Sequence, residues 1–480
     1  PYSALIFGNP KYDKTYEKNI KKENGKLIYR FDNDTTIINK MTKDPRSFGW
    51  GGLYIGTINN FGDDKYAGGF GAESSQSKGG PSYTIDMTGH DLHIQTDISP
   101  EEGTTGSQPM WTSAGIAAYR EGTITFDNPG AININTNINY YYGSGIRVST
   151  AQPTDHGSHV IINNDNKPEH AVKIRGGISS AGYEMNYRAL EVFTQPKSAG
   201  NSIIIKGLVD IETEGGAATM FARENGSYIS VGGGRLIAKN YDSMWTNSEK
   251  ARIDVNMITD ADGNVTDAGN NPVEIEGHAT TMTTWYGTGG IINIGLTTGD
   301  SKFTGEFAGA GTQNMWLRNG AVWNNTGIVY NPWSGSNYIS DISSHVTWLH
   351  GGNDKSSAGN IIQNSASDLY IDNLDGCTKL FMEHDLNYVV PEFAKNPDGS
   401  DKVDKDGNKI KNEDAGQKKI FGKLGNVIIA KAHKREGKNS EISLITDNKG
   451  LNTSSGKAAD KNLVSETLNA LAGKLYYEAY

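Results

Sequence analysis

The chain of 480 residues has a single cysteine, Cys377, and so cannot form an internal disulfide bond. Disulfides are common in extracellular proteins and rare where thiols stay reduced. One cysteine therefore indicates either a reducing compartment or an export route that avoids disulfides. We expect Cys377 itself to be a small apolar residue in a core position.

Long apolar segments are also missing. Hydrophobic residues make up 36% of the chain, and no stretch approaches the ~20 apolar residues that a membrane helix needs. The opening residues Pro1-Tyr2-Ser3 lack the basic and apolar regions of a signal peptide, so we expect the sequence to begin at a processed boundary or one chosen for expression. A compact globule of this length would need a thicker apolar core than this composition supplies.

Basic residues are outnumbered by acidic ones. The chain has 45 Lys and Arg against 55 Asp and Glu, a net charge of -10. This balance argues against nucleic acid or an anionic membrane surface as the main partner. Charged residues are only 21% of the chain, and apolar residues recur in alternating runs, so a disordered protein is excluded as well.

Short runs of β-branched residues, bounded by Gly, Asn or Asp, recur along the chain. Their apolar residues alternate with a period of two, which is typical of half-buried strands. Helical periodicity is nearly absent before the last twenty residues, which excludes α/β folds. Representative runs are Thr123–Phe126, Ala131–Asn135, Ser202–Ile205, Tyr228–Val231, Arg252–Val255 and Ile291–Ile294.

The spacing of these runs distinguishes a solenoid from a sandwich or a barrel. Strands of sandwiches and barrels recur about every 8–12 residues, whereas longer Gly-rich and Asn-rich segments separate Ile203, Ile229 and Ile253. We therefore predict an all-β fold, a right-handed parallel β-helix (β-solenoid), with coils of about 20–30 residues and insertions on some coils. At ~4.8 Å per coil, the rod is expected to be on the order of 70–90 Å long.

Two segments are predicted to leave the coils. The Asp262-Gly263 pair predicts a hairpin that returns to a strand at Val273–Ile275. Residues 395–419 are rich in Lys, Asp, Asn and Gly, and they predict a solvated loop or ribbon.

The end of the chain has a different pattern. Apolar residues from Asp460 onward recur at helical spacing and predict a short C-terminal α-helix within residues 456–480. This helix would cap the open end of the solenoid or lead to a following module. The residues on its apolar face are Val464, Leu468, Leu471 and Leu475.

One stretch near the end combines two strands with a tight turn. A strand from Asn314 leads to an Asn319-Gly320 turn and then to Ala321-Val322-Trp323-Asn324. The segments that follow are, in order, Trp348–Gly352, Asp368–Gly376, Asn426–Ala430 and Leu471–Tyr477. This order resembles the C-terminal part of the passenger domains of monomeric (type Va) autotransporters of two-membrane bacteria. The resemblance covers about Phe303 to Tyr480, and upstream only the solenoid style is shared.

The resemblance implies an organisation in four parts. Residues 1–90 would form an N-terminal capping region with the first coils, and residues 91–350 the main solenoid with insertions. Residues 351–455 would be the C-terminal passenger coils with the charged loop at 395–419. Residues 456–480 would be the helix leading toward a membrane barrel that this sequence lacks. Such passengers cross two membranes unfolded, which would account for the scarcity of cysteine.

Motifs for catalysis are weak in this sequence. The string Gly299-Asp300-Ser301-Lys302 lacks the Gly that follows the nucleophile in serine proteases. An EF-hand-like segment has Lys402 at the first ligand position, although Asp404, Asp406, Gly407 and Glu413 fall at later positions. We therefore expect no catalytic residue, no metal and no cofactor.

Carboxylates on or near strands leave one enzymatic alternative open. Asp210, Glu212, Asp254 and Glu274 are expected to point outward, where carboxylates are ordinarily solvated. Stacked coils could nevertheless bring two of them within the ~5–9 Å that glycoside chemistry requires.

Aromatic residues are the best candidates for ligand binding. Neighbours on a strand face opposite sides, so the residues of Tyr140-Tyr141-Tyr142 cannot all point inward, and Trp285-Tyr286 has the same property. Outward rings can stack on sugars or anchor a protein partner, although they can also simply cover insertions. The predicted ligand-binding residues are Tyr140, Tyr142, Trp285 and Tyr286.

Together, these expectations favour a binding protein over an enzyme. We expect an adhesin, secreted to the bacterial cell surface and either anchored at the outer membrane or released. Its partners would be a host extracellular-matrix protein, a glycan or another bacterial surface, with self-association possible. The alternative is a carbohydrate-active enzyme, a polysaccharide lyase or hydrolase, on the same β-helix. A third interpretation, a phage tail fibre or capsular structural protein, requires an obligate trimer.

Overall fold

The structure is a computed structural model of the whole chain. It describes residues 3–7, 20–23, 26–41, 51–56, 82–98, 114–119, 122–138, 143–149, 157–177, 187–194, 199–214, 218–281, 289–326, 343–365, 368–382, 385–389, 391–394, 400–413, 415–416, 418–421, 427–437, 440–444 and 475–479. Within these ranges the chain forms a parallel β-solenoid, which confirms the predicted fold class.

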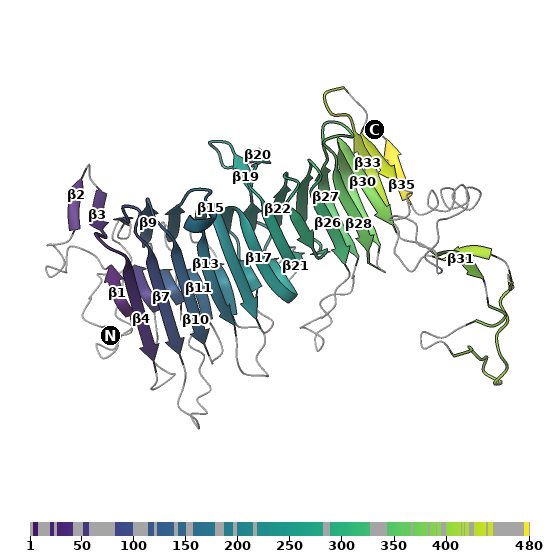
Figure 1. Ribbon diagram of the computed structural model, residues 1–480, viewed down its shortest axis with the longest axis horizontal. Coiled ribbons are helices and arrows are strands. Elements are labelled where there is room, and N and C mark those ends of the chain that lie inside the picture. The colour runs from purple at the N-terminus through teal and green to yellow at the C-terminus, as the bar shows by residue number, and fades with distance from the viewer. Residues whose placement is uncertain are drawn as a thin grey trace.

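Strands of successive coils lie side by side along an elongated body (Figure 1). They form three faces, each a stack of parallel strands joined by backbone hydrogen bonds. Face A contains β3 (Lys26–Arg30), β6 (Ser82–Asp86), β9 (Thr123–Asp127), β12 (His159–Asn163), β18 (Arg252–Val255), β22 (Ile291–Leu296) and β25 (Thr312–Leu317). Face B contains β4 (Thr35–Met41), β7 (Leu92–Ile98), β10 (Ile132–Ile138), β13 (Val172–Gly177), β23 (Lys302–Thr304), β26 (Val322–Thr326), β28 (Gly359–Asn364), β30 (Cys377–Met382) and β34 (Glu441–Leu444). Face C contains β1 (Ser3–Phe7), β5 (Gly51–Gly56), β8 (Ala114–Tyr119), β11 (Gly143–Ser149), β14 (Tyr187–Phe193), β16 (Ala218–Arg223) and β24 (Phe307–Gly309).

Some strands continue around a corner from one face to the next. The strands β15 (Asn201–Glu214) and β17 (Ser227–Thr246) start on face A, and β21 (Val273–Thr281) runs from face B to face C. Nearer the end, β27 (Ser344–His350), β29 (Leu369–Asp375) and β33 (Val427–His433) each start above face C and finish on face A. In the last coils one long strand therefore takes the place of separate strands on faces C and A, and face B forms the other side.

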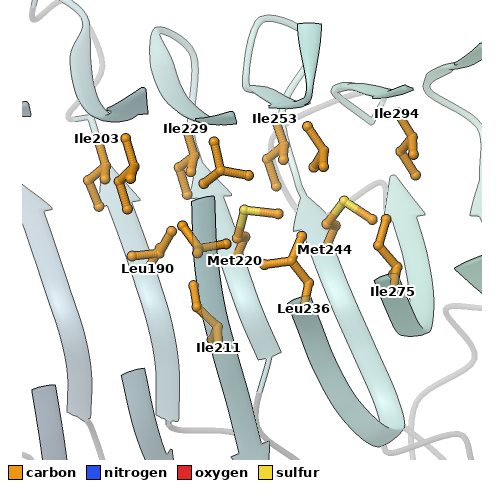
Figure 2. Packing of buried hydrophobic residues seen from close by; sticks show 14 of the residues in the cluster. Leu190, Ile203, Ile211, Met220, Ile229, Leu236, Met244, Ile253, Ile275 and Ile294 are labelled. Carbon is orange, nitrogen blue, oxygen red and sulfur yellow. The ribbon is translucent and has the colours of Figure 1, made fainter. Parts of the chain in front are cut away.

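Apolar side chains from successive coils stack into ladders that fill the interior (Figure 2). All members of the ladders shown are at most 1% exposed. Because each inward side chain touches its counterparts in the coils above and below, these rows make a continuous core. The three ladders are Ile203–Ile229–Ile253 on face A, Ile211–Leu236–Ile275 on face B and Leu190–Met220–Met244 on face C.

The number of residues per coil varies as predicted. Stacked partners are 21 residues apart for Asn293 and Asn314, but 43 apart for His159 and Ser202. Twelve described strands stack on face B, which at ~4.8 Å per step spans about 50 Å. Insertions consume residues without adding coils to this described stack.

A buried asparagine shapes the corner after β18. Asn256 is 2% exposed and adopts a left-handed φ of 57°. Its Nδ2 donates to the carbonyl oxygens of Gly269, Asn271 and Gly295, at 3.1, 3.2 and 2.9 Å. Its short side chain thus satisfies carbonyl groups that the turn removes from the β-ladder.

The predicted hairpin is confirmed by the antiparallel pair β19 (Met257–Thr259) and β20 (Val265–Ala268). The Asp260 carboxylate closes its turn by accepting the backbone N–H groups of Asp262 and Asn264 at 3.0 and 2.8 Å. At its tip, the carbonyl oxygen of Gly263 accepts a hydrogen bond from Arg252 Nη1 (2.7 Å). The hairpin stands beside face A (Figure 1).

A second excursion lies within residues 385–421. It begins and ends with the antiparallel strands β31 (Asp385–Val389) and β32 (Lys418–Phe421), away from the coils (Figure 1). Antiparallel bridges join Phe393 to Lys411 and Val403 to Lys409, and Val403 is 55% exposed. The described part of the predicted 395–419 loop is thus a ribbon that pairs with itself. The strand β2 (Ile20–Glu23), antiparallel to β3, also lies outside the three faces.

Two expectations fail. Residues Leu475–Ala479 form strand β35, paired in parallel with β33, so the predicted C-terminal helix is wrong there, and residues 445–474 lie outside the described residues. Parallel pairing with an existing strand satisfies backbone groups that an isolated helical turn would leave open. Cys377 is half-buried rather than in the core, because the 1% exposed Thr378 is the inward neighbour.

Helical structure is minimal among the described residues. Its one example is the 3₁₀ turn η1 (Pro168–His170). None of the described segments therefore has a helix of the length and apolarity that a membrane crossing requires.

Candidate functional site

The four predicted ligand-binding residues lie outside the described residues. Tyr140 and Tyr142 fall in the connection from β10 on face B to β11 on face C. Trp285 and Tyr286 fall in the connection from β21 on face C to β22 on face A. The structure therefore leaves their role as a prediction.

The described residues contain a different aromatic cluster, on the outward side of face A in its last coils. Trp316 from β25 stacks on His350 from β27, with ring centroids 4.4 Å apart. Trp348, two residues before His350, lies 4.9 Å from the ring of His433 on β33. Trp316 is 6% exposed, whereas Trp348, His350 and His433 are half-buried. We call these four rings, with Asn373, Asp375, Arg318 and Arg435, the ladder patch.

The parallel register explains why these rings meet. Trp316, His350, Asp375 and His433 occupy equivalent positions in four consecutive coils, so their side chains stack along the axis. His350 Nδ1 and Asp375 Oδ2 are 2.9 Å apart, and His433 Nε2 is 2.8 Å from Asn373 Oδ1. Each imidazole is thereby fixed in orientation by a neighbouring coil.

Two arginines border the patch and are held within the protein. Arg318 Nη1 lies 2.9 Å from the Asp267 carboxylate of the β19–β20 hairpin. Arg435 Nη1 donates to the carbonyl oxygen of Gly351 (2.5 Å) and lies 3.7 Å from Asp375. Burial acts to raise the pKa of Asp375, but the hydrogen bond and charge of His350 and the charge of Arg435 hold this pKa below its usual value.

A second cluster lies on the outward side of face C and is closed to solvent. Glu191 is 4% exposed, accepts a hydrogen bond from Ser144 Oγ (2.7 Å) and lies 3.5 Å from Arg147 Nη1. Burial acts to raise the pKa of Glu191, yet the charges of Arg147 and Arg188 hold it below its usual value. The Arg188 guanidinium also lies 4.6 Å from the ring of Phe221. Such paired, buried charges form a rigid support rather than an accessible site.

The same face carries a buried acid and a buried histidine. Asp242 and His278 are register partners in adjacent coils, 8% and 6% exposed. Burial raises the pKa of Asp242 to about 6, although Thr280 Oγ1 donates a hydrogen bond to it. Burial lowers the pKa of His278 to about 4. His278 Nδ1 accepts the backbone N–H of Glu306, which is fully buried.

The predicted outward carboxylates are tied to arginines. Asp210 lies 2.7 Å from Arg175 and 3.0 Å from Arg235, and Arg235 also lies 3.2 Å from Glu274. Arg235 Nη1 is 3.7 Å from Glu212, the remaining carboxylate of this group on face B.

The fourth predicted carboxylate, Asp254, projects from face A yet is fully buried. Arg252 binds it through two nitrogens, and Tyr228 Oη and Asn293 Nδ2 donate to it at 2.9 and 2.7 Å. A carboxylate that accepts this many hydrogen bonds anchors the side chains around it.

The weak sequence motifs also have structural roles. Ser301 is 1% exposed, and its Oγ accepts the N–H of Val273 at a solenoid corner (3.1 Å). The Asp404 carboxylate accepts the N–H groups of Asp406 and Asn408, both at 2.9 Å, in the same kind of turn that Asp260 closes. Within the described ranges, His, Cys, Asp and Glu do not gather in any group of three or more that could hold a metal ion.

Sequence reasoning did not identify the ladder patch. The alternation Trp348-Leu349-His350 places both rings on one side of a strand, which is a readable signal. Their stacking on Trp316 and His433 was not readable, because insertions of different lengths separate the coils.

Comparisons with protein-family models, with curated proteins and with solved structures gave no match.

Proposed function

We propose that this protein is an adhesin, a rigid rod displayed on a bacterial surface that binds a glycan, a matrix protein or another cell. Display is supported by the resemblance of residues 303–480 to autotransporter passengers. A stack of coils with a continuous apolar core is suited to holding a binding surface away from a cell, because neighbouring coils support one another along the axis.

The observation that carries the proposal is the ladder patch. Half-buried Trp348, His350 and His433 project from face A. In earlier coils the residues in register with Trp348 are Thr125, Ile161, Ile204, Ser230, Asp254, Asn293 and Asn314. Aromatic side chains such as tryptophan are among those that dominate binding energies at interfaces.

A carbohydrate-active enzyme is the second candidate, and Asp242 favours it. A carboxyl group with a pKa of about 6 beside a neutral histidine is a pair typical of acid–base sites. Against this, Asp242 and His278 are at least 92% buried, so a substrate would need a rearrangement to reach them. Binding therefore remains the better supported function.

A binding array of glycans, matrix proteins and immobilised bacteria tests the proposal on the full chain. Trp348→Ala and the double variant Tyr140→Ala/Tyr142→Ala are measured beside His93→Ala, which changes an exposed residue on face B. Binding of the parent chain, weakened in Trp348→Ala and unchanged in His93→Ala, is expected. Release of shortened glycan with no stable binding would replace the adhesin by the enzyme.

A further inference from the structure

We infer that the ladder patch binds an uncharged carbohydrate, one or a few sugar units long. The inference rests on the proposed binding function and adds the chemical class of the ligand and the residues that contact it.

Charge is the first argument. Arg318 is paired with Asp267, and Arg435 with Asp375 and the Gly351 carbonyl oxygen. Neither guanidinium is left to neutralise a carboxylate, sulfate or phosphate on a ligand. An uncharged ligand leaves these pairs intact.

Size is the second argument. The ladder patch consists of eight residues on four coils, whereas a protein partner of ordinary affinity contacts about 20–30 residues on each side. Four coils at ~4.8 Å per step span about 14 Å, which is the scale of a short oligosaccharide rather than a protein surface.

Hydrogen-bonding capacity is the third argument. His350 uses Nδ1 for Asp375, and His433 uses Nε2 for Asn373. The other imidazole nitrogens and the indole N–H of Trp348 make no hydrogen bond to any described residue. Half-buried rings with unused polar groups match the alternating C–H and O–H surface of a sugar.

The test uses the full chain on a panel of neutral, sialylated and sulfated oligosaccharides with immobilised matrix proteins. We expect neutral oligosaccharides to bind with an affinity that hardly changes between low and high salt. Trp348→Ala is expected to weaken binding about tenfold or more, Trp348→Phe to weaken it less, and His93→Ala to leave it unchanged. Circular dichroism and thermal unfolding establish that each variant is folded.

The outcomes separate this inference from the proposed function. Binding of matrix protein or cells without any oligosaccharide overturns the inference and leaves the adhesin standing. Salt-sensitive binding of only sialylated or sulfated sugars also overturns it. Neutral-sugar binding that Trp348→Ala leaves intact moves the site elsewhere and rejects the ladder patch. Binding to no surface at all rejects both proposals.

Discussion

At the scale of single residues, the interior accepts its largest side chain where the backbone leaves room. Trp323 is fully buried, and its ring lies parallel to that of Phe303 with centroids 6.2 Å apart. Its Nε1 donates to the carbonyl oxygen of Gly305 (3.1 Å). The ring therefore joins the cores of adjacent coils through both packing and a hydrogen bond.

Replacing this ring should have a large effect on stability. We expect Trp323→Ala to lower the free energy of unfolding by about 3–5 kcal/mol, because it leaves a cavity between coils. Urea titration followed by circular dichroism measures the loss. Half-buried Trp348→Ala is the matched control with a smaller loss, and equal losses would contradict the burial of Trp323.

Asp242 should make stability depend on pH. Its carboxyl pKa is raised from 3.8 to about 6, so the folded state holds the proton more tightly than the unfolded state. The resulting stability is present below pH ~4 and is lost as pH rises through about 6. Asp242→Asn should therefore be more stable than the parent at pH 7, by up to about 3 kcal/mol, and similar to it at pH 4. Thermal unfolding at both pH values measures this difference, and a constant difference would contradict the assignment.

Single residues also show the limit of prediction from sequence. The alternation around Ile229 and Ile253 was sufficient to predict strands and a solenoid core. It was not sufficient to predict that Cys377 faces outward. A shift of one residue in the strand register moves every side chain of the strand to the opposite face. The ladder patch was missed for a related reason, since its rings meet only when four coils align.

At the scale of elements, the corners of the solenoid depend on particular residues as much as its strands do. Asn256 combines a left-handed backbone with three bonds to carbonyl groups of the turn around the β19–β20 hairpin. Glycine can adopt this backbone conformation but cannot make the side-chain hydrogen bonds. Alanine cannot make them either, and it adopts the left-handed backbone only with strain.

Two substitutions separate these contributions. Asn256→Gly should lower the free energy of unfolding by about 2–3 kcal/mol through the lost hydrogen bonds. Asn256→Ala should cost about 1 kcal/mol more because of its left-handed φ. Guanidinium titration of both variants measures the order, and an alanine variant more stable than the glycine variant would contradict the backbone argument.

Elements were predictable where local signals agreed. The Asp-Gly turn predicted the β19–β20 hairpin because the turn chemistry is local. The helical spacing before Tyr480 failed at Leu475–Ala479, where pairing with β33 replaces the helix. Tertiary pairing of this kind depends on a distant strand, and a local pattern carries no information about it.

At the scale of the whole molecule, a single stack of coils predicts an elongated monomer. Light scattering should give a mass near 51.9 kDa, and small-angle scattering a rod-like distance distribution. An obligate trimer would support the tail-fibre interpretation instead.

The direction of the backbone hydrogen bonds has a mechanical consequence. In the parallel stack these bonds run from coil to coil along the rod, so tension on its two ends loads them in series. A rod pulled lengthwise should yield by peeling one coil after another, lengthening at a nearly constant force. In the proposed adhesin, such a rod would be a tether that absorbs energy before an attached cell detaches.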